Sequence, residues 1–152
     1  MSAIDLTLPT PDAAERLGAA IAGLLRPGDA VLLQGPLGAG KTTLARGLIR
    51  ALTSPDQEVP SPTFTLAQAY DAPDFTLTHF DLYRLKRAEE AEEIGLWEAL
   101  DDGAAVIEWP ERLGNALPSD RLAVELSPDP AGRRARLTPH GAWRLRDHTP
   151  FA

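Results

Sequence analysis

The stretch GPLGAGKTT, from Gly35 to Thr43, restricts the possible folds of this 152-residue chain more than any other segment. It satisfies the pattern G-x-x-x-x-G-K-[ST], follows the apolar run 30–34 and precedes residues with helical periodicity. Glycines allow the backbone to curl so that successive N–H groups point at phosphate oxygens, and the N-terminus of the following helix adds partial positive charge. A strand before this loop and a helix after it are the context that phosphate binding requires, so the sequence predicts a nucleotide site.

Each position of the loop has an expected role. Pro36 has no backbone N–H to donate, so we expect the phosphate cradle to begin at Leu37. Lys41 can reach the β- and γ-phosphates, and the Thr42 hydroxyl can ligate Mg²⁺. The predicted nucleotide contacts in the loop are Leu37, Gly38, Ala39, Gly40, Lys41, Thr42 and Thr43.

The rest of the chain predicts an α/β fold of the P-loop NTPase type, as a single domain over residues 1–152. Apolar periodicity indicates helices, and short apolar or alternating runs between turn signals indicate strands. We expect helices over 11–25, 41–52 and 88–100, and strands over 4–8, 30–34, 64–70, 75–80, 104–107, 121–127 and 133–138. The expected arrangement is a mainly parallel central sheet flanked by helices, with a C-terminal β-hairpin and a loose or variable tail over 139–152.

Composition excludes several classes of protein. The chain has no Cys, which rules out disulfides and thiolate zinc sites. Its net charge is −7, and nucleic-acid affinity rests mainly on cations that neutralise phosphates, so tight autonomous binding of DNA or RNA is not expected. No apolar run approaches the roughly 20 residues of a membrane span, and the N-terminus lacks signal-peptide features. We therefore expect a soluble, cytoplasmic protein with no membrane contact.

Two carboxylates follow predicted strands. Asp81 comes after 75–80, and Glu108 comes after 104–107. Ligands of open α/β sheets bind beyond the carboxyl ends of parallel strands, so both acids are expected to face the phosphate loop. Nucleotide hydrolysis needs groups that hold the metal and position water, and either acid suits either role. Thr63 is a further candidate, since its hydroxyl could sense the γ-phosphate or cap a turn.

Two other features have both a structural and a functional interpretation. His79 precedes Asp81 in a predicted strand, and we expect its ring to lie in the core or to support the site rather than to act in catalysis. Strand alternation places Arg134 and Arg136 on one face and Arg133 on the other. These arginines are either ordinary surface residues or contacts for nucleotide phosphate or for RNA held by a partner.

Four segments together resemble one known family. They are GPLGAGKTTLARG, SPTFTLAQAY, THFDLYRL and VIEWPERL, and their order and spacing are similar to those of the TsaE family, small P-loop ATPases of bacterial tRNA threonylcarbamoyladenosine synthesis. The similarity runs from about Leu6 to Arg136. The phosphate loop alone is shared by many families, whereas the combination of SPTFTL, HFDLYR and IEWPE is specific.

The resemblance implies a Mg²⁺-dependent ATPase that hydrolyses ATP slowly on its own. It also implies the partners TsaB and TsaD, whose complex transfers the threonylcarbamoyl group to adenosine 37 of tRNA while ATP turnover supports repeated cycles. The tRNA would be reached mainly through these partners. Matched by motif, Thr42 and Glu108 fall on metal-binding positions, Lys41, Asp81 and Thr63 fall on catalytic or switch positions, and Arg133 falls in a segment near the nucleotide. Pro36 stands where the family often has an acidic residue.

Three other functions are compatible with a phosphate loop. A small-molecule P-loop kinase needs an acceptor pocket and usually an Arg-bearing lid, and no insertion here is long enough to form a separate lid. A GTPase switch is disfavoured because no N-K-x-D guanine-reading tetrapeptide occurs. The third alternative is a non-catalytic, nucleotide-dependent binding module, which a slow ATPase closely resembles.

Overall fold

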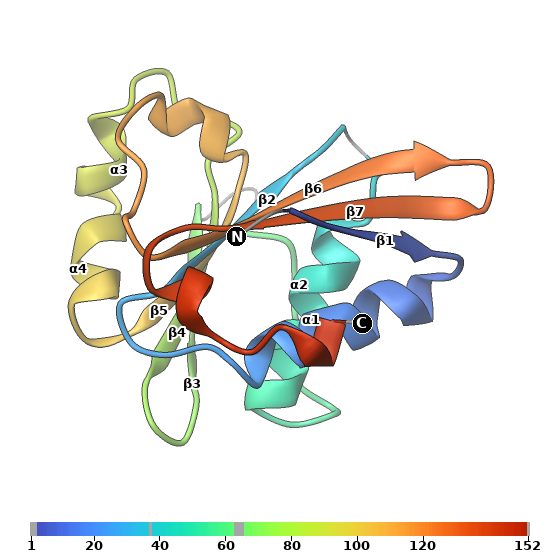
Figure 1. Cartoon of the computed structure of the whole chain (residues 1–152). Coiled ribbons are helices and arrows are strands. Elements are labelled where there is room, and N and C mark those ends of the chain that lie inside the picture. The colour runs from blue at the N-terminus through green and yellow to red at the C-terminus, as the bar shows by residue number, and fades with distance from the viewer. Residues whose placement is uncertain (1–2, 37, 63–65, 152) are drawn as a thin grey trace.

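A β-sheet with helices on both faces forms the middle of the molecule (Figure 1). The computed structural model describes residues 3–36, 38–62 and 66–151. The strands are β1 (Ile4–Leu8), β2 (Ala30–Gln34), β3 (Ala67–Asp71), β4 (Thr76–Asp81), β5 (Ala104–Glu108), β6 (Arg121–Asp129) and β7 (Gly132–Pro139). The helices are α1 (Pro11–Ala22), α2 (Lys41–Leu52), α3 (Glu90–Glu93) and α4 (Leu96–Asp102), and the 3₁₀ helices are η1 (Pro110–Leu113), η2 (Gly141–Leu145) and η3 (Thr149–Phe151). The predicted α/β class is confirmed.

The sheet is parallel at its centre and antiparallel outside it. The strand order is β1-β7-β6-β2-β5-β4-β3. The inner strands β6, β2, β5 and β4 pair in parallel, whereas β7 and β1 extend one side of the sheet and β3 extends the other with antiparallel pairing. The predicted parallel centre and C-terminal hairpin are therefore both present.

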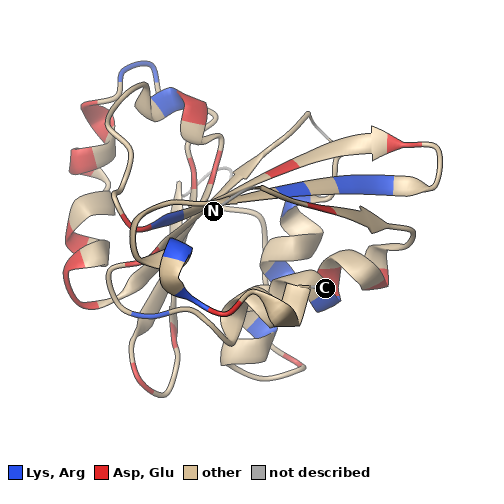
Figure 2. Ribbon diagram, in the orientation of Figure 1, with Lys and Arg blue, Asp and Glu red and all other residues tan. Residues whose placement is uncertain are grey.

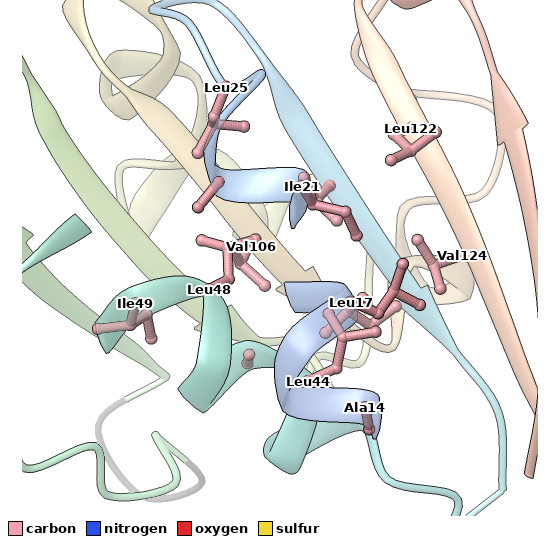
Figure 3. Packing of buried hydrophobic residues seen from close by; sticks show 14 of the residues in the cluster. Ala14, Leu17, Ile21, Leu25, Leu44, Leu48, Ile49, Val106, Leu122 and Val124 are labelled. Atoms are coloured by element: carbon pink, nitrogen blue, oxygen red, sulfur yellow. The ribbon is translucent and has the colours of Figure 1, made fainter. Parts of the chain in front are cut away.

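Apolar side chains bury the central strands on both faces. Successive residues of a strand point to opposite faces, and in β2 Leu33 packs in the cluster of α1 and α2 whereas Leu32 packs in the cluster of α3 and α4. Figure 3 shows part of the first cluster, where side chains of α1 and α2 lie against Val106 of β5 and Val124 of β6. The continuous apolar sequence of β2 is explained by this burial on both sides.

Two glycines allow the backbones of helices α1 and α2 to approach each other closely. A Cβ atom at Gly18 would lie 2.2 Å from the carbonyl oxygen of Leu44, and one at Gly47 would lie 2.2 Å from the carbonyl oxygen of Glu15. Real Cβ atoms do not approach backbone oxygens so closely, so only glycine fits at either position. Helix α1 begins as its sequence predicts, because the Thr10 side chain accepts a hydrogen bond from the backbone N–H of Ala13.

The expectation of one helix over 88–100 is wrong. The structure has α3 and α4 instead, separated at Gly95, whose φ of +80° lies in the left-handed region. A second helix begins after this break, and Trp97 in its first turn is 37% exposed.

The expectation of a loose tail over 139–152 is also wrong for the residues that the structure describes. Trp143 is fully buried, and Phe151 packs in the same apolar cluster as α1 and α2. The Arg146 guanidinium forms a buried ion pair with the Asp29 carboxylate, with a distance of 3.0 Å between Nη2 and Oδ1. Arg146 also donates to the Leu24 carbonyl oxygen, so this segment is fixed to the turn after α1.

Charge is distributed unevenly over this fold (Figure 2). Residues 88–102, which include α3 and α4, contain seven Asp or Glu and no Lys or Arg. The charge of this segment, −7, equals the net charge of the whole chain. Acidic and basic side chains are therefore balanced in the remaining sequence. None of the helices that the structure describes is long and apolar enough to cross a bilayer.

Candidate nucleotide site

The parallel strands bring the two predicted carboxylates to the same end of the sheet. Asp81 is the last residue of β4 and Glu108 is the last residue of β5, and the two are direct partners in the strand register. Glu108 is also paired with Leu33 of β2, one residue before the strand leads into the glycine-rich loop. Both carboxylates therefore lie beside the start of α2, as the position of strand ends predicted.

A pocket of about 560 Å³ lies between these strand ends, the glycine-rich loop and the N-terminus of α1. Residues that carry the predicted chemistry line it, namely Gly38, Gly40, Lys41, Thr42, Thr43, Asp81, Glu108 and Arg133. Its other lining residues are Leu8, Pro9, Thr10, Pro11, Ala14, Ser61, Trp109 and Gly132. The pocket thus has a polar region at α2 and an apolar wall at α1, which suits a ligand with a charged end and a planar or apolar end.

Two described residues of the loop have a backbone conformation that requires glycine. Gly38 and Gly40 have φ values of +80° and +100°, in the left-handed region that favours glycine. Gly40 is also the N-cap of α2, and no side chain of the described residues caps this helix end. The first N–H groups of α2 are therefore available to a ligand in the pocket. Gly35 lets the loop cross close to β6, since a Cβ atom there would lie 2.4 Å from the Leu126 carbonyl oxygen.

Lys41 is bound to the loop itself. Its Nζ atom donates a hydrogen bond of 2.7 Å to the Gly35 carbonyl oxygen and lies 3.7 Å from the ring centroid of Trp109. Burial lowers the pKa of this lysine from its usual value near 10.5, and the carboxylates of Glu108, Glu111 and Asp81 oppose that effect in this order. The ammonium group therefore lies against an aromatic face and is stabilised by the negative charge of nearby carboxylates.

Trp109 is a site residue that sequence reasoning did not identify. It follows Glu108 directly and has φ of +59°, which is uncommon for a residue with a bulky side chain. Its ring packs against Tyr83 at 4.9 Å between centroids and at a tilt of 58°. The only signal in the sequence was its position between a strand-end acid and Pro110. Ser61, which also lines the pocket, was not singled out either.

The two carboxylates have different surroundings. Asp81 Oδ1 accepts a hydrogen bond of 3.0 Å from the backbone N–H of Tyr83. Glu108 Oε2 lies 2.6 Å from Nε2 of His79, whose side chain is fully buried. The predicted supporting position of His79 thus agrees with the structure. Both acids are more than nine-tenths buried, and both line the pocket.

Arg133 reaches the loop from the C-terminal hairpin. Its Nη2 atom donates a hydrogen bond of 2.8 Å to the Gly38 carbonyl oxygen. Arg136 lies on the other face of β7, as alternation predicts, and forms an ion pair of 3.0 Å with Asp5 of β1. Only Arg133 of this basic group therefore lines the pocket.

Three predicted site residues are not placed in the pocket by this structure. Ala39 is buried in the core, and its backbone N–H donates to the Pro36 carbonyl oxygen at 3.1 Å, so this donor is already used within the loop. Leu37 and Thr63 lie outside the described residues.

Comparison with known proteins identifies the family. The family model described as "Threonylcarbamoyl adenosine biosynthesis protein TsaE" matches residues 8–136. The chain belongs to the TsaE family. A TsaE protein of Rickettsia conorii is 42% identical over 120 residues, which cover 79% of this chain and 69% of that protein. The TsaE protein of Bacillus subtilis is 35% identical over 115 residues, covering 75% and 71%.

A solved structure supports the fold of this TsaE family member. The crystal structure of YdiB from Bacillus subtilis superimposes with a TM-score of 0.73 at 25% sequence identity, covering 95% of this chain and 89% of that chain. Residues 139–151, which form the packed C-terminal segment, follow the residues that the family model matches.

Proposed function

We propose that this protein binds and slowly hydrolyses ATP with Mg²⁺, as a component of tRNA threonylcarbamoyladenosine synthesis. The observation that supports this most strongly is the convergence of Lys41, Thr42, Asp81 and Glu108 on one pocket at the N-terminus of α2. The relatives are named tRNA threonylcarbamoyladenosine biosynthesis proteins, which gives the pathway.

The residues present fit a nucleotide and a divalent cation. The open N-terminus of α2, Gly38, Gly40 and Lys41 offer backbone N–H groups and a cation to the phosphates. The apolar wall at Leu8, Pro11 and Ala14 offers a surface for the nucleoside, opposite the charged end. The described residues contain no group of three or more His, Asp or Glu placed to hold a metal. This agrees with Mg²⁺ bound through one or two protein oxygens, phosphates and waters.

In the proposed mechanism, the chain binds, orients and neutralises. Bound Mg²⁺ would supply charge neutralisation at the phosphates and is assigned to Thr42 and Glu108. Lys41 exchanges the Gly35 carbonyl for phosphate oxygens and stabilises the negative charge that develops during transfer to water. Asp81, whose Oδ1 accepts a hydrogen bond from the Tyr83 N–H, would orient the attacking water. Both acids are positioned by buried strands rather than by loops, since Asp81 ends β4 and Glu108 ends β5.

The biological role proposed for this ATPase is to support turnover of a TsaB–TsaD complex in the cytoplasm. Reaching tRNA through such partners suits a chain with a net charge of −7, because its 22 acidic side chains outnumber its 15 basic ones and the excess negative charge opposes direct contact with phosphates. A small-molecule kinase and a non-catalytic nucleotide-binding module are the alternatives.

The deciding experiment measures ATP hydrolysis with and without purified TsaB and TsaD, and identifies the product. Release of free phosphate that the partners stimulate strongly supports the proposal. A phosphorylated acceptor would identify a kinase instead. Tight ATP binding with no turnover under either condition would identify a binding module.

A further inference from the structure

His79 and Glu108 form a buried pair directly under the floor of the pocket. The imidazole Nε2 lies 2.6 Å from Glu108 Oε2, the side chain of His79 is 0% exposed, and that of Glu108 is 5% exposed. An ionised carboxylate only accepts hydrogen bonds, so we assign the proton to Nε2 and treat the histidine as the donor.

The strand register explains why these two side chains meet. His79 is paired with Val106, and Asp81, two residues later, is paired with Glu108. Alternation therefore puts His79, Asp81 and Glu108 on the same face of the sheet, with the histidine one step further from the pocket than the two acids. That face is the one covered by α1 and α2, since Leu77 and Val106 pack in the same cluster as these helices.

The bonding of the imidazole distinguishes it from an ordinary core histidine. Its Nδ1 atom is buried and has no hydrogen-bond partner among the described residues, so Glu108 is the contact that holds the ring. A buried polar atom without a partner carries a desolvation cost, which a leucine at this position would avoid. The short bond to Glu108 is the feature of the structure that compensates for this cost.

We propose that His79 is a positioning residue for Glu108. By donating to Oε2, it fixes the carboxylate in one orientation and leaves Oε1 as the oxygen available to a divalent cation in the pocket. A carboxylate held in this way presents one oxygen to a metal without losing side-chain entropy when the metal binds. This inference rests on the proposed function, because a Mg²⁺ ion at Glu108 is part of that function.

The test compares two amides of different reach at position 79. Gln places its amide nitrogen near the position of imidazole Nε2, whereas the Asn side chain is one methylene shorter and cannot reach Glu108 from the same backbone. The affinity of the full chain for a fluorescent ATP analogue is measured at equilibrium, once with Mg²⁺ and once with EDTA. The ratio of the two affinities reports metal binding and requires no turnover.

We expect His79→Asn to lower this ratio roughly tenfold, the effect typical of losing a group that orients a metal ligand. The affinity in EDTA should stay within about twofold of the parent, because the phosphate cradle is untouched, and His79→Gln should keep most of the ratio. The matched control is Leu77→Ala, which lies two residues earlier on the same face and is also fully buried. It should lower the melting temperature and leave the ratio unchanged.

The proposal is overturned if both amides keep the parent ratio, or if Leu77→Ala lowers the ratio as much as His79→Asn does. A parent protein with no metal effect on affinity would instead contradict the proposed function itself. A second measurement needs no variant at position 79. In ¹⁵N-histidine-labelled protein, the ring resonances of His79 should shift on Glu108→Gln substitution and again when Mg²⁺ and nucleotide are added to the parent. Unshifted resonances in both cases would also overturn the proposal.

Discussion

The ammonium group of Lys41 lies 3.7 Å from the ring centroid of Trp109, inside the pocket that we assign to the nucleotide. The same ammonium group donates to the Gly35 carbonyl oxygen. Phosphate binding must therefore replace an existing aromatic contact and an existing hydrogen bond. Cation–π contacts of this kind contribute about 0.5–2 kcal/mol. The contacts that Lys41 gains with a triphosphate must exceed this loss.

Nucleotide binding should consequently be visible in the fluorescence of Trp109. Moving a cation away from the indole ring changes its electrostatic surroundings, and we expect ATP to change the emission of the parent protein. Trp97 and Trp143 are the other two tryptophans, and neither lines the pocket. The ATP-dependent change should disappear in Trp109→Phe and persist in Trp97→Phe. If Lys41 instead stays over the ring when the nucleotide binds, ATP should leave the emission of the parent protein unchanged.

Lys41→Ala should lose most nucleotide affinity. Hydrogen bonds to charged groups contribute about 1.5–3 kcal/mol, which corresponds to roughly a ten- to hundredfold rise in the dissociation constant. Isothermal titration with ATP measures this directly. Arg50→Ala, at the far end of the same helix, serves as a control for loss of a cation and should bind as the parent does.

Glu108→Ala should separate binding from turnover. The phosphate cradle stays intact, so ATP binding is partly retained, while Mg²⁺-dependent hydrolysis is lost because a metal-holding carboxylate is missing. Phosphate release in the presence of TsaB and TsaD is the measurement. Hydrolysis at the parent rate in that assembled complex would show that Glu108 has been assigned the wrong role.

Arg146→Ala should strongly destabilise the fold. The substitution leaves the Asp29 carboxylate, which is 1% exposed, without its guanidinium partner. Breaking a buried pair on one side costs about 3–5 kcal/mol, and denaturant unfolding should show a loss near the lower figure because the Arg26 N–H still donates to Asp29. Arg144→Ala, on an exposed side chain of the same segment, should unfold like the parent.

Asp5→Asn should lower the stability of the fold at neutral pH and have no effect in strong acid. The hydrogen bond from Arg136 is the main cause that lowers the pKa of Asp5 from its usual value of 3.8, with the positive charges of Arg136 and Arg134 adding to it. A carboxyl group whose pKa is lowered by folding stabilises the fold above its unfolded pKa, and this contribution is lost as pH falls through the folded value. Melting curves of the two proteins should differ slightly at pH 7 and converge below pH 3.8. A difference that persists in acid would assign it to something other than this ion pair.

Much of the site followed from local sequence patterns. The glycine-rich loop, the strand before it and the helix after it predicted where phosphates would bind, and the rule for parallel strand ends predicted that Asp81 and Glu108 would meet. These inferences succeed because they depend on backbone geometry that a few residues determine.

The features that the sequence did not reveal depend on contacts between distant segments. Asp29 and Arg146 form one buried pair, yet nothing in the local pattern of either residue indicates its partner. The break at Gly95 was missed because a single glycine is tolerated within a helical pattern. The positive φ of Trp109 has no local signature, since a bulky residue adopts it only when the surrounding structure imposes it.

The tight crossing of α1 and α2 makes the pocket sensitive to a methyl group placed behind it. Pro11 and Ala14 of α1 form one wall of the pocket, and Lys41 and Thr42 of α2 form its floor, so the spacing of the two helices determines the width of the opening. An alanine at Gly47 would push the two helices apart at a point away from the pocket. The pocket between them would widen, and the affinity for a nucleotide would fall.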